Sequence, residues 1–221
     1  MVNNAFLAPM CITLVIAWAS VGDALANAHV AYATVRGEIA MSSWKALRDQ
    51  DIEKQDLDYS CGSAAAATIL RYFYGQAVDE QGILDQVVAV GDDGAASFSD
   101  LKHAVAHYGF KAIGLTLSFE RLKGIRIPAI VYLRYRDKDH FSVIRGIDAR
   151  GRVWLGDPSW GNRLFSQSQF KAMWETRDSA TLTGKILLIT PQASSAASVN
   201  HAFFQPPRAN ATAVRLLTLR R

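Results

Sequence analysis

The residues with the clearest chemical potential lie in the stretch 55–67, where a polar loop runs into an alanine-rich run of helix formers. Cys61 stands at the expected start of that helix, and the positive end of a helix dipole favours a thiolate over a thiol. Gln55 lies six residues upstream and carries a neutral amide that donates hydrogen bonds. A thiol and a nearby amide are what a cysteine nucleophile and its oxyanion-binding donor require.

A thiol nucleophile also needs a base and a group that orients the base. Among the five histidines, His140 opens a predicted strand directly after a charged turn, where a side chain can project into a cleft. Asp157 ends the strand predicted to pair with it, so its carboxylate can accept from the imidazole and fix the tautomer. The sequence thus predicts a triad of Cys61, His140 and Asp157. We expect Gln55 and the backbone N–H of Cys61 to bind the oxyanion.

Each of these residues also has an ordinary structural interpretation. Cys61 is compatible with a small core position, His140 with a hydrogen-bonded strand histidine, and Asp157 with a turn before Pro158. Their joint occurrence in this order, on these elements, favours a site. Trp160 is interpreted mainly as a packing residue, with a place beside a substrate groove as the alternative.

A second group of polar residues lies on one predicted helix. His103 and His107 are spaced i, i+4, with Asp100 nearby. A helical histidine pair without a third strong ligand is more typical of a solvated face than of a metal site. We therefore predict no metal and no cofactor.

Composition limits the other functions. The chain has 221 residues, of which 50% are hydrophobic, enough for one sizeable domain with tails. The net charge is +4, without a dense Lys/Arg block apart from Arg220-Arg221, so no nucleic-acid footprint is indicated. No GxxxxGK[ST] phosphate loop occurs, and we predict no ATP binding.

The N-terminus has the features of an export signal. Residues 10–19 are apolar, and Ala24-Leu25-Ala26 is a small-x-small cleavage site. Gly22 and Asp23 interrupt the apolar run well short of the ~20 residues that span a bilayer. We expect residues 1–26 to be a signal peptide and the mature protein to be periplasmic. A retained N-terminal anchor is the alternative, which leaves membrane association open. Cleavage removes Cys11 and leaves Cys61 as the only thiol.

Hydrophobic periodicity predicts an α+β fold in which N-terminal helices pack on an antiparallel sheet. The expected boundaries are an N-terminal arm over 27–49, a domain over 50–191 and a C-terminal extension over 192–221, whose composition is typical of disordered segments. Helices are predicted at 61–74, 79–90, about 99–108, 118–123 and 166–175. Strands are predicted at 111–117, 128–135, 140–147, 153–155 and 185–190, with a charged turn at 136–139.

The ordered motifs resemble the peptidase C39 family, papain-like cysteine proteases best known as leader-cleaving domains of bacteriocin exporters. The resemblance covers roughly residues 50–190. Its motifs are Gln55-x5-Cys61-Gly62, Tyr72-Phe73-Tyr74-Gly75, His140-Phe141-Ser142-Val143-Ile144, Asp157-Pro158 and Phe170-x3-Trp174. The resemblance implies a papain-like fold with Cys61 as nucleophile and His140 as general base. It also implies Asp157 as the orienting acid and Gln55 as the oxyanion-hole donor.

The expected signal peptide, and a sequence without the exporters' membrane and ATPase domains, make the chain more similar to exported stand-alone members. These include members encoded with bacterial functional-amyloid secretion systems. We therefore expect a periplasmic endopeptidase that cleaves an exported polypeptide, with components of a secretion or amyloid system as partners. The exporters' preference for cutting after Gly-Gly is not carried over, because another compartment implies another substrate. Two alternatives stay open: a non-hydrolytic peptide-binding chaperone or adaptor, and an acyl transferase using the same thiol.

Overall fold

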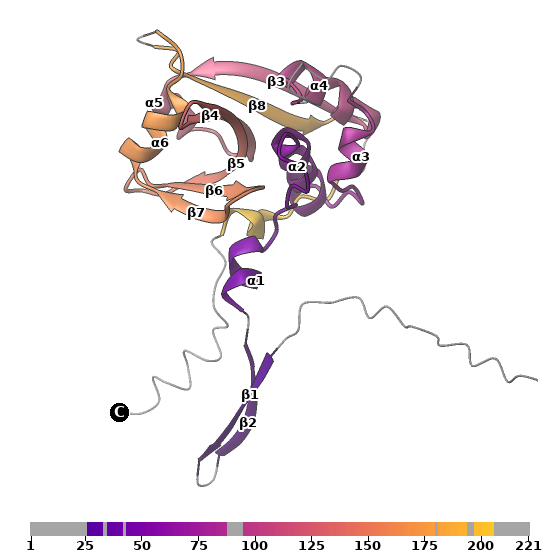
Figure 1. The fold of residues 1–221 in the computed structure, drawn as a ribbon, viewed down its shortest axis with the longest axis vertical. Helices are drawn as coiled ribbons and strands as arrows, with labels where there is room; N and C mark the ends of the chain where they lie inside the picture. The colour runs from indigo at the N-terminus through magenta and orange to yellow at the C-terminus, as the bar shows by residue number, and fades with distance from the viewer. Residues whose placement is uncertain are drawn as a thin grey trace, which may run out of the picture.

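A six-stranded antiparallel sheet, ordered β3-β8-β4-β5-β6-β7, forms the centre of the fold. Helices α2, α3 and α4 lie on one side of the sheet, and α5 and α6 lie on the other (Figure 1). A computed structural model of the chain describes residues 26–32, 35–41, 43–87, 95–179, 181–193 and 197–205. The predicted signal peptide therefore lies outside the described residues except for Ala26, as do residues 206–221 of the predicted extension.

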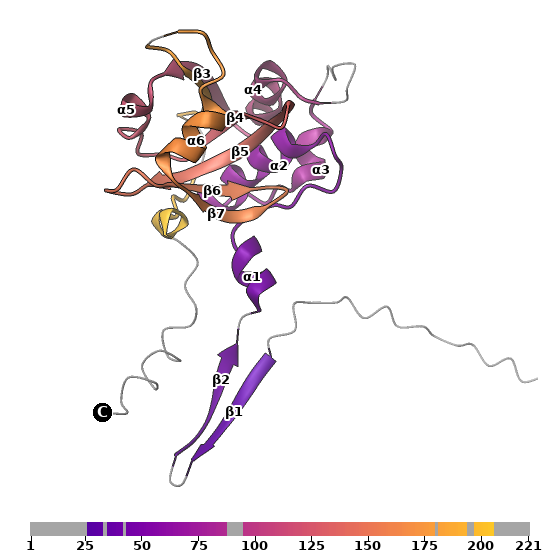
Figure 2. The same cartoon turned by 60° about the vertical axis from the view of Figure 1, so that its left-hand side comes forward.

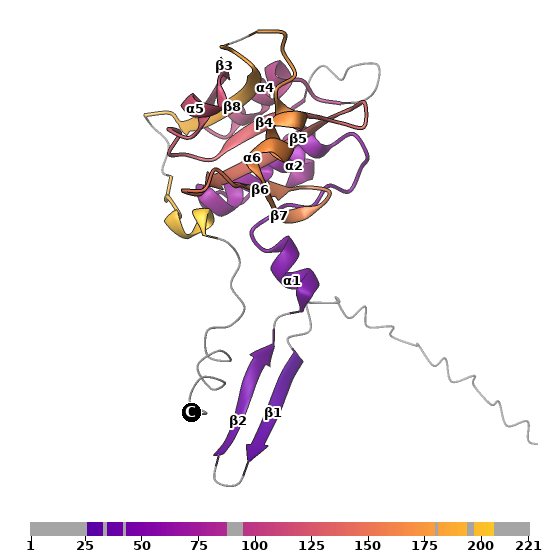
Figure 3. The ribbon, with the colours of Figure 1, turned by 90° about the vertical axis from the view of Figure 1, so that its left-hand side faces the viewer.

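The chain enters through a two-stranded hairpin and a short helix that together correspond to the predicted arm. These are β1 (Ala26–Tyr32), β2 (Val35–Met41) and α1 (Trp44–Asp49). The hairpin projects away from the sheet and its helices, as Figures 2 and 3 show from two further sides. Among the described residues, no helix is both long enough and apolar enough to cross a bilayer.

The remaining elements follow the predicted order. The helical segments are α2 (Cys61–Thr68), the π-helical η1 (Ile69–Phe73), α3 (Glu80–Leu84), α4 (Phe98–His107), α5 (Phe119–Leu122), α6 (Gln167–Trp174) and the 3₁₀ turn η2 (His201–Phe204). The strands are β3 (Phe110–Leu117), β4 (Ala129–Tyr135), β5 (Lys138–Ile147), β6 (Val153–Asp157), β7 (Gly161–Phe165) and β8 (Gly184–Pro191).

Helix α2 is buried along its whole length. Its alanine side chains are small, so the helix approaches β5 closely. At Gly62 a Cβ atom would meet the Phe141 ring at 3.1 Å and Leu101 at 3.3 Å, tighter than ordinary van der Waals contact. This close approach holds the N-terminus of α2, and with it Cys61, against β5.

The turn before β5 is shorter than predicted. Strands β4 and β5 pair from Tyr135↔Lys138 onward, so Arg136 and Asp137 alone form the connection. Both have positive φ, 51° and 59°, as a two-residue type I′ hairpin turn requires. The prediction that His140 opens the strand is therefore wrong: His140 is the third residue of β5 and lies opposite Leu133.

Two helix boundaries and one strand also differ from the prediction. The helix expected at 79–90 is α3, which ends at Leu84 because i→i+3 bonds from Gln86 and Val87 close its last turn; residues 88–90 lie outside the described part. Helix α4 begins earlier than expected, because Ser97 forms a capping box with Asp100. Strand β7 was not predicted.

The folded body continues past the predicted limit at Pro191. Residues 197–205 return to the domain, where Phe203 is fully buried. The backbone N–H of Asn200 donates to the Phe73 carbonyl at 2.9 Å. The buried Arg145 donates to the Phe203 carbonyl at 2.7 Å, and its guanidinium lies 4.2 Å from the Phe203 ring centroid. Phe203 therefore brings the described part of the predicted extension into contact with the core.

We expect Phe203→Ala to lower the free energy of unfolding by about 3–5 kcal/mol, because it leaves a cavity and removes the ring beside Arg145. Urea unfolding monitored by circular dichroism measures the change. Val199→Ala is the matched control, since Val199 lies in the same segment but is 45% exposed. Equal stabilities of the two variants would show that the segment does not contribute to the core.

Candidate active site

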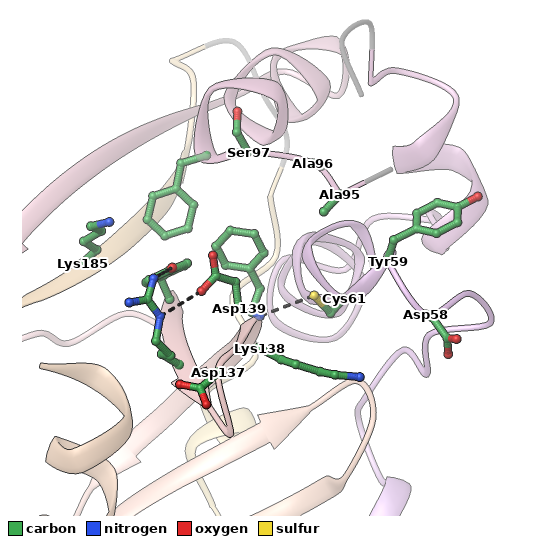
Figure 4. Close-up of a pocket in the computed structure, with 14 residues that line it drawn as sticks. Asp58, Tyr59, Cys61, Ala95, Ala96, Ser97, Asp137, Lys138, Asp139 and Lys185 are labelled. Atoms are coloured by element: carbon green, nitrogen blue, oxygen red, sulfur yellow. Dashed lines mark hydrogen bonds and ion pairs between the residues drawn. The ribbon is translucent and has the colours of Figure 1, made fainter. Parts of the chain in front are cut away.

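The Cys61 thiol lies at the base of a cleft of about 960 Å³ (Figure 4). Cys61 is the first residue of α2 and is 6% exposed. The backbone N–H of Phe141 donates to its Sγ at 3.4 Å. N–H groups in the first turn of a helix have no partner within the helix and create a positive potential there. The sulfur therefore lies where a negative charge is stabilised and backbone donors are available.

His140 and Asp157 are joined as the sequence predicts. The imidazole Nε2 lies 2.8 Å from Asp157 Oδ2. Asp157 is fully buried, and 13% of the His140 side chain is exposed. The second carboxylate oxygen of Asp157 accepts from the N–H groups of Ser159 at 2.9 Å and Trp160 at 2.8 Å. Both oxygens are thus engaged, which fixes the orientation of the carboxylate toward the imidazole.

Cys61 interacts with the same imidazole. Burial by itself disfavours the charged ring, but hydrogen bonds to Asp157 and Cys61, together with their negative charges, raise the pKa of His140 to about 10. The ring is therefore protonated at neutral pH. With Nε2 directed at Asp157, Nδ1 is the nitrogen that serves Cys61. The structure thus brings Cys61, His140 and Asp157 into one hydrogen-bonded cluster.

Trp160 covers the imidazole. Its ring centroid lies 5.0 Å from that of His140 and 5.3 Å from that of Tyr135. An apolar cover keeps water from competing for the His140–Asp157 hydrogen bond and strengthens it in a lower dielectric. Trp160 is therefore a packing residue, and the group that it packs on is the imidazole of His140, the predicted base.

Gln55 is held beside the Asp157 loop. Its backbone N–H donates to the Pro158 carbonyl at 3.3 Å, and its Oε1 accepts from the Ser159 hydroxyl. Its Nε2 donates to the Leu57 carbonyl at 2.8 Å, which occupies one of the two N–H groups of the amide. The described contacts do not join Gln55 to Cys61, so its role at the oxyanion stays a prediction.

Sequence reasoning missed two contributors. The Ser159 hydroxyl donates to Gln55 Oε1, and the Ser159 backbone carbonyl accepts from Lys54 Nζ at 2.8 Å, so Ser159 contacts two residues of the segment before α2. Phe141 supplies the N–H group at the sulfur. Phe141 follows His140 directly and Ser159 lies two residues after Asp157, so proximity in the sequence to predicted site residues was the available signal.

The histidines of α4 take no part in this cluster. Asp100 is used in the capping box with Ser97, and the His107 ring packs against Tyr108 at 5.4 Å. Within the described residues, no group of three or more His, Cys, Asp or Glu side chains is placed to hold a metal ion.

Comparison with known proteins gives one family. The model of the peptidase C39 family matches residues 49–194. A probable functional amyloid protease FapD from Pseudomonas aeruginosa is 32% identical over 139 residues, which cover 61% of each chain. Its counterpart from Pseudomonas fluorescens is 29% identical over 175 residues, covering 76% of this chain and 75% of the relative. The alignment thus spans less than two thirds of the first relative and three quarters of the second.

Two solved structures share the fold. A double glycine motif protease from an AMS/PCAT transporter, in complex with the leader peptide, aligns with a TM-score of 0.52 and 24% identity, covering 64% of this chain and 91% of that one. The peptidase domain of Streptococcus ComA, a bifunctional ABC transporter, aligns with a TM-score of 0.53 and 18% identity, covering 64% and 98%. The predicted α+β fold is therefore confirmed.

We expect Asp157→Asn to lower the pKa of His140 from about 10 toward the ordinary value of ~6.5. NMR titration of the imidazole carbon shifts measures it. Because folding raises this pKa, its contribution to stability is complete below pH ~6.5 and is lost as pH rises through about 10. The variant should therefore lose less stability than wild type between pH 7 and 10. An unchanged imidazole titration would exclude Asp157 as the cause.

Proposed function

The chain belongs to the peptidase C39 family, and from that premise we propose that it is a cysteine endopeptidase with Cys61 as its nucleophile. The observation that carries the proposal is the shared imidazole: His140 interacts with Cys61 on one side and with the buried Asp157 on the other. A protonated His140 stabilises a thiolate at Cys61 and holds the proton that the leaving group needs.

In the first half-reaction the Cys61 thiolate attacks the carbonyl carbon of the scissile peptide, forming a C–S bond. The carbonyl oxygen becomes an oxyanion, which the Cys61 backbone N–H and the Gln55 amide stabilise by about 3 kcal/mol per donor, as in comparable sites. Such a donation requires the Gln55 amide to use its second N–H or to release Leu57. His140 then protonates the amine as the C–N bond breaks, leaving an acyl-enzyme.

In the second half-reaction water replaces the amine. Neutral His140 accepts a proton from the water as it attacks the acyl carbon, and the C–S bond breaks. The peptide acid leaves, and the Cys61 thiolate beside protonated His140 is restored. Asp157 holds the imidazole orientation through both steps and stays ionised.

We propose that the substrate is an exported polypeptide and that the reaction takes place in the periplasm. The signal-like sequence of residues 1–26 supports the location. The names of the Pseudomonas relatives, functional amyloid proteases, support a link to amyloid or peptide secretion. The transporter protease with its bound leader peptide supports a polypeptide that is cut during export.

The test compares secreted and periplasmic proteins from cells that carry wild type or Cys61→Ala. We expect one or more new protein N-termini that appear only with Cys61, and mass spectrometry of terminal peptides identifies both the substrate and the cut. Ser63→Ala is a matched control two residues further along α2. If Cys61→Ala produces the same termini as wild type, the peptidase mechanism is wrong and a binding function on this fold is favoured.

The oxyanion role of Gln55 has its own test. We expect Gln55→Ala to lower kcat by about 10²–10³ with little change in KM, because the donor acts only in the transition state. Stopped assays on the purified enzyme measure both constants. Gln76→Ala, a glutamine outside the cluster, serves as the control. A kcat within twofold of wild type would assign the oxyanion to backbone N–H groups alone.

A further inference from the structure

The two edges of the sheet differ in what covers them. Strand β7 forms one edge and β3 forms the other (Figure 1). Strand β7 has five residues, and α1 lies against it: a Cβ atom at Gly161 would meet Arg48 and Asp49 at 2.7 Å. Strand β3 has eight residues and pairs, within the described chain, with β8 alone. The side of β3 that faces away from β8 therefore leaves backbone groups without a strand to bind.

The register of β3 with β8 identifies those backbone groups. The N–H of Gln192 donates to the Gly109 carbonyl at 2.9 Å, and the two residues lie one position beyond the end of the paired register. Hydrogen-bonded pairs recur at every second residue of an antiparallel ladder, so the odd-numbered residues of β3 bind β8. The even-numbered residues direct their N–H and C=O groups outward. Within the described residues, no hydrogen bond reaches the backbone groups of Ala112, Gly114 and Thr116.

The side chains of β3 make this edge apolar. Ile113 and Leu115 are 44% and 39% exposed, and both lie on the face that carries Leu117. Between them Gly114 has no side chain, and a Cβ atom there would have no neighbour within 4 Å. Strand β3 contains no proline, and Lys111 is its only charged residue. Proline and several charges, which usually protect an edge strand from pairing, are thus missing from most of this edge.

We propose that β3 is an interaction surface for a second copy of this chain, with the two β3 strands antiparallel about a two-fold axis at Gly114. In this register Gly114 pairs with Gly114 of the second copy, and Ala112 pairs with its Thr116. These are the residues whose backbone groups point outward, so both strands complete their hydrogen bonds. Ile113 lies opposite Leu115 of the second copy, and Leu115 opposite its Ile113. Four exposed apolar side chains therefore meet on one face of the joined sheets.

Two neighbouring registers also bring even-numbered residues together. An axis at Ile113 would place Leu115 opposite the charged Lys111. An axis at Leu115 would pair only residues 113–117, whereas the axis at Gly114 pairs residues 111–117. Of the three registers, the one centred on Gly114 combines the longer ladder with direct contact between the exposed apolar side chains.

Charges at the two ends of the paired strands are complementary. Lys111 lies opposite Leu117 of the second copy, on the face of the sheet where Leu117 packs with α5. The acidic residue of α5 is Glu120, whose side chain is 71% exposed and bonded to Lys123 at 2.7 Å. In the proposed register Lys111 therefore brings a second cation toward this acid, once at each end of the ladder.

The size of the surface sets the strength of the dimer. Seven paired residues form a strip about 24 Å long, at ~3.4 Å per residue, and one strand wide. Such a strip buries less than the ~1,200 Å² of a stable protein–protein interface. The proposed dimer is therefore weak and depends on protein concentration.

A disulfide trap detects even a weak dimer in this register. Gly114→Cys is made in the full chain together with Cys11→Ala and Cys61→Ala, so that the chain carries a single thiol. Two residues of a hydrogen-bonded pair have Cα atoms ~5.5 Å apart, within the ~4.4–6.8 Å that a disulfide spans. In a glutathione redox buffer we expect about fivefold more disulfide-linked dimer than for Gly146→Cys in the same background, because pairing raises the effective concentration of the thiols. Non-reducing gels measure both yields.

Gly146 is the matched control for this trap. A Cβ atom at Gly146 also has no neighbour within 4 Å, but the residue lies on β5, inside the sheet. Equal dimer yields for the two cysteine variants would overturn the proposal. The trap lacks the Cys61 thiol, so its outcome is independent of the proposed peptidase function.

Charge substitutions then test which residues face each other. In the Gly114→Cys background we expect Ile113→Lys to lower the dimer yield about fivefold, because it places lysines in the apolar cluster. Adding Leu115→Glu should restore the yield to within about twofold, since each new lysine then lies opposite a glutamate of the second copy. Leu164→Lys is the control and should keep the parent yield, because Leu164 is 42% exposed but lies on β7. Circular dichroism verifies that each variant is folded. A yield that Ile113→Lys leaves unchanged, or that Leu115→Glu does not restore, overturns the proposal.

Discussion

The close contact between α2 and β5 is the constraint on which the site depends. A helix of alanine and glycine can approach a sheet more closely than one with large side chains, and at Gly62 even a methyl group would press on Phe141 and Leu101. This approach places the first residue of the helix against the strand that carries the imidazole. The sulfur and the base are thereby brought together by packing of the backbone, and neither is carried by a loop.

A second set of contacts joins the segment before α2 to the turn after β6. Asp157 ends β6, and the turn that follows it is tied to the segment before α2 through Ser159, which contacts both Lys54 and Gln55. Asp157, His140 and Gln55 are thus joined in one hydrogen-bonded framework. Trp160 covers the imidazole end of this framework, where Asp157 is fully buried. A hydrogen bond is stronger in such a low-dielectric setting, and it holds the imidazole in one orientation.

The sequence predicted the fold class, most elements and the cluster of Cys61, His140 and Asp157, because helix starts, strand alternation and turn residues are local signals. It did not predict what depends on contacts between distant segments. It also missed two local boundaries, the two-residue turn at Arg136 and Asp137 and the early end of α3. The burial of Phe203 could not be read from an Ala/Ser/Pro-rich context. The contacts of Gln55 depend on Ser159, more than a hundred residues away in the chain.

The return of the C-terminal turn to the core has a consequence for the order of folding. During synthesis the segment with Cys61 emerges before β5, and Phe203, which closes the core around Arg145, emerges after all six strands of the sheet. Contacts between such distant residues form late, because the intervening chain must first be ordered. The native domain is thus complete only when the chain has been released through Phe203. Until β5 has been released, the Cys61 thiol therefore has no imidazole beside it to activate it.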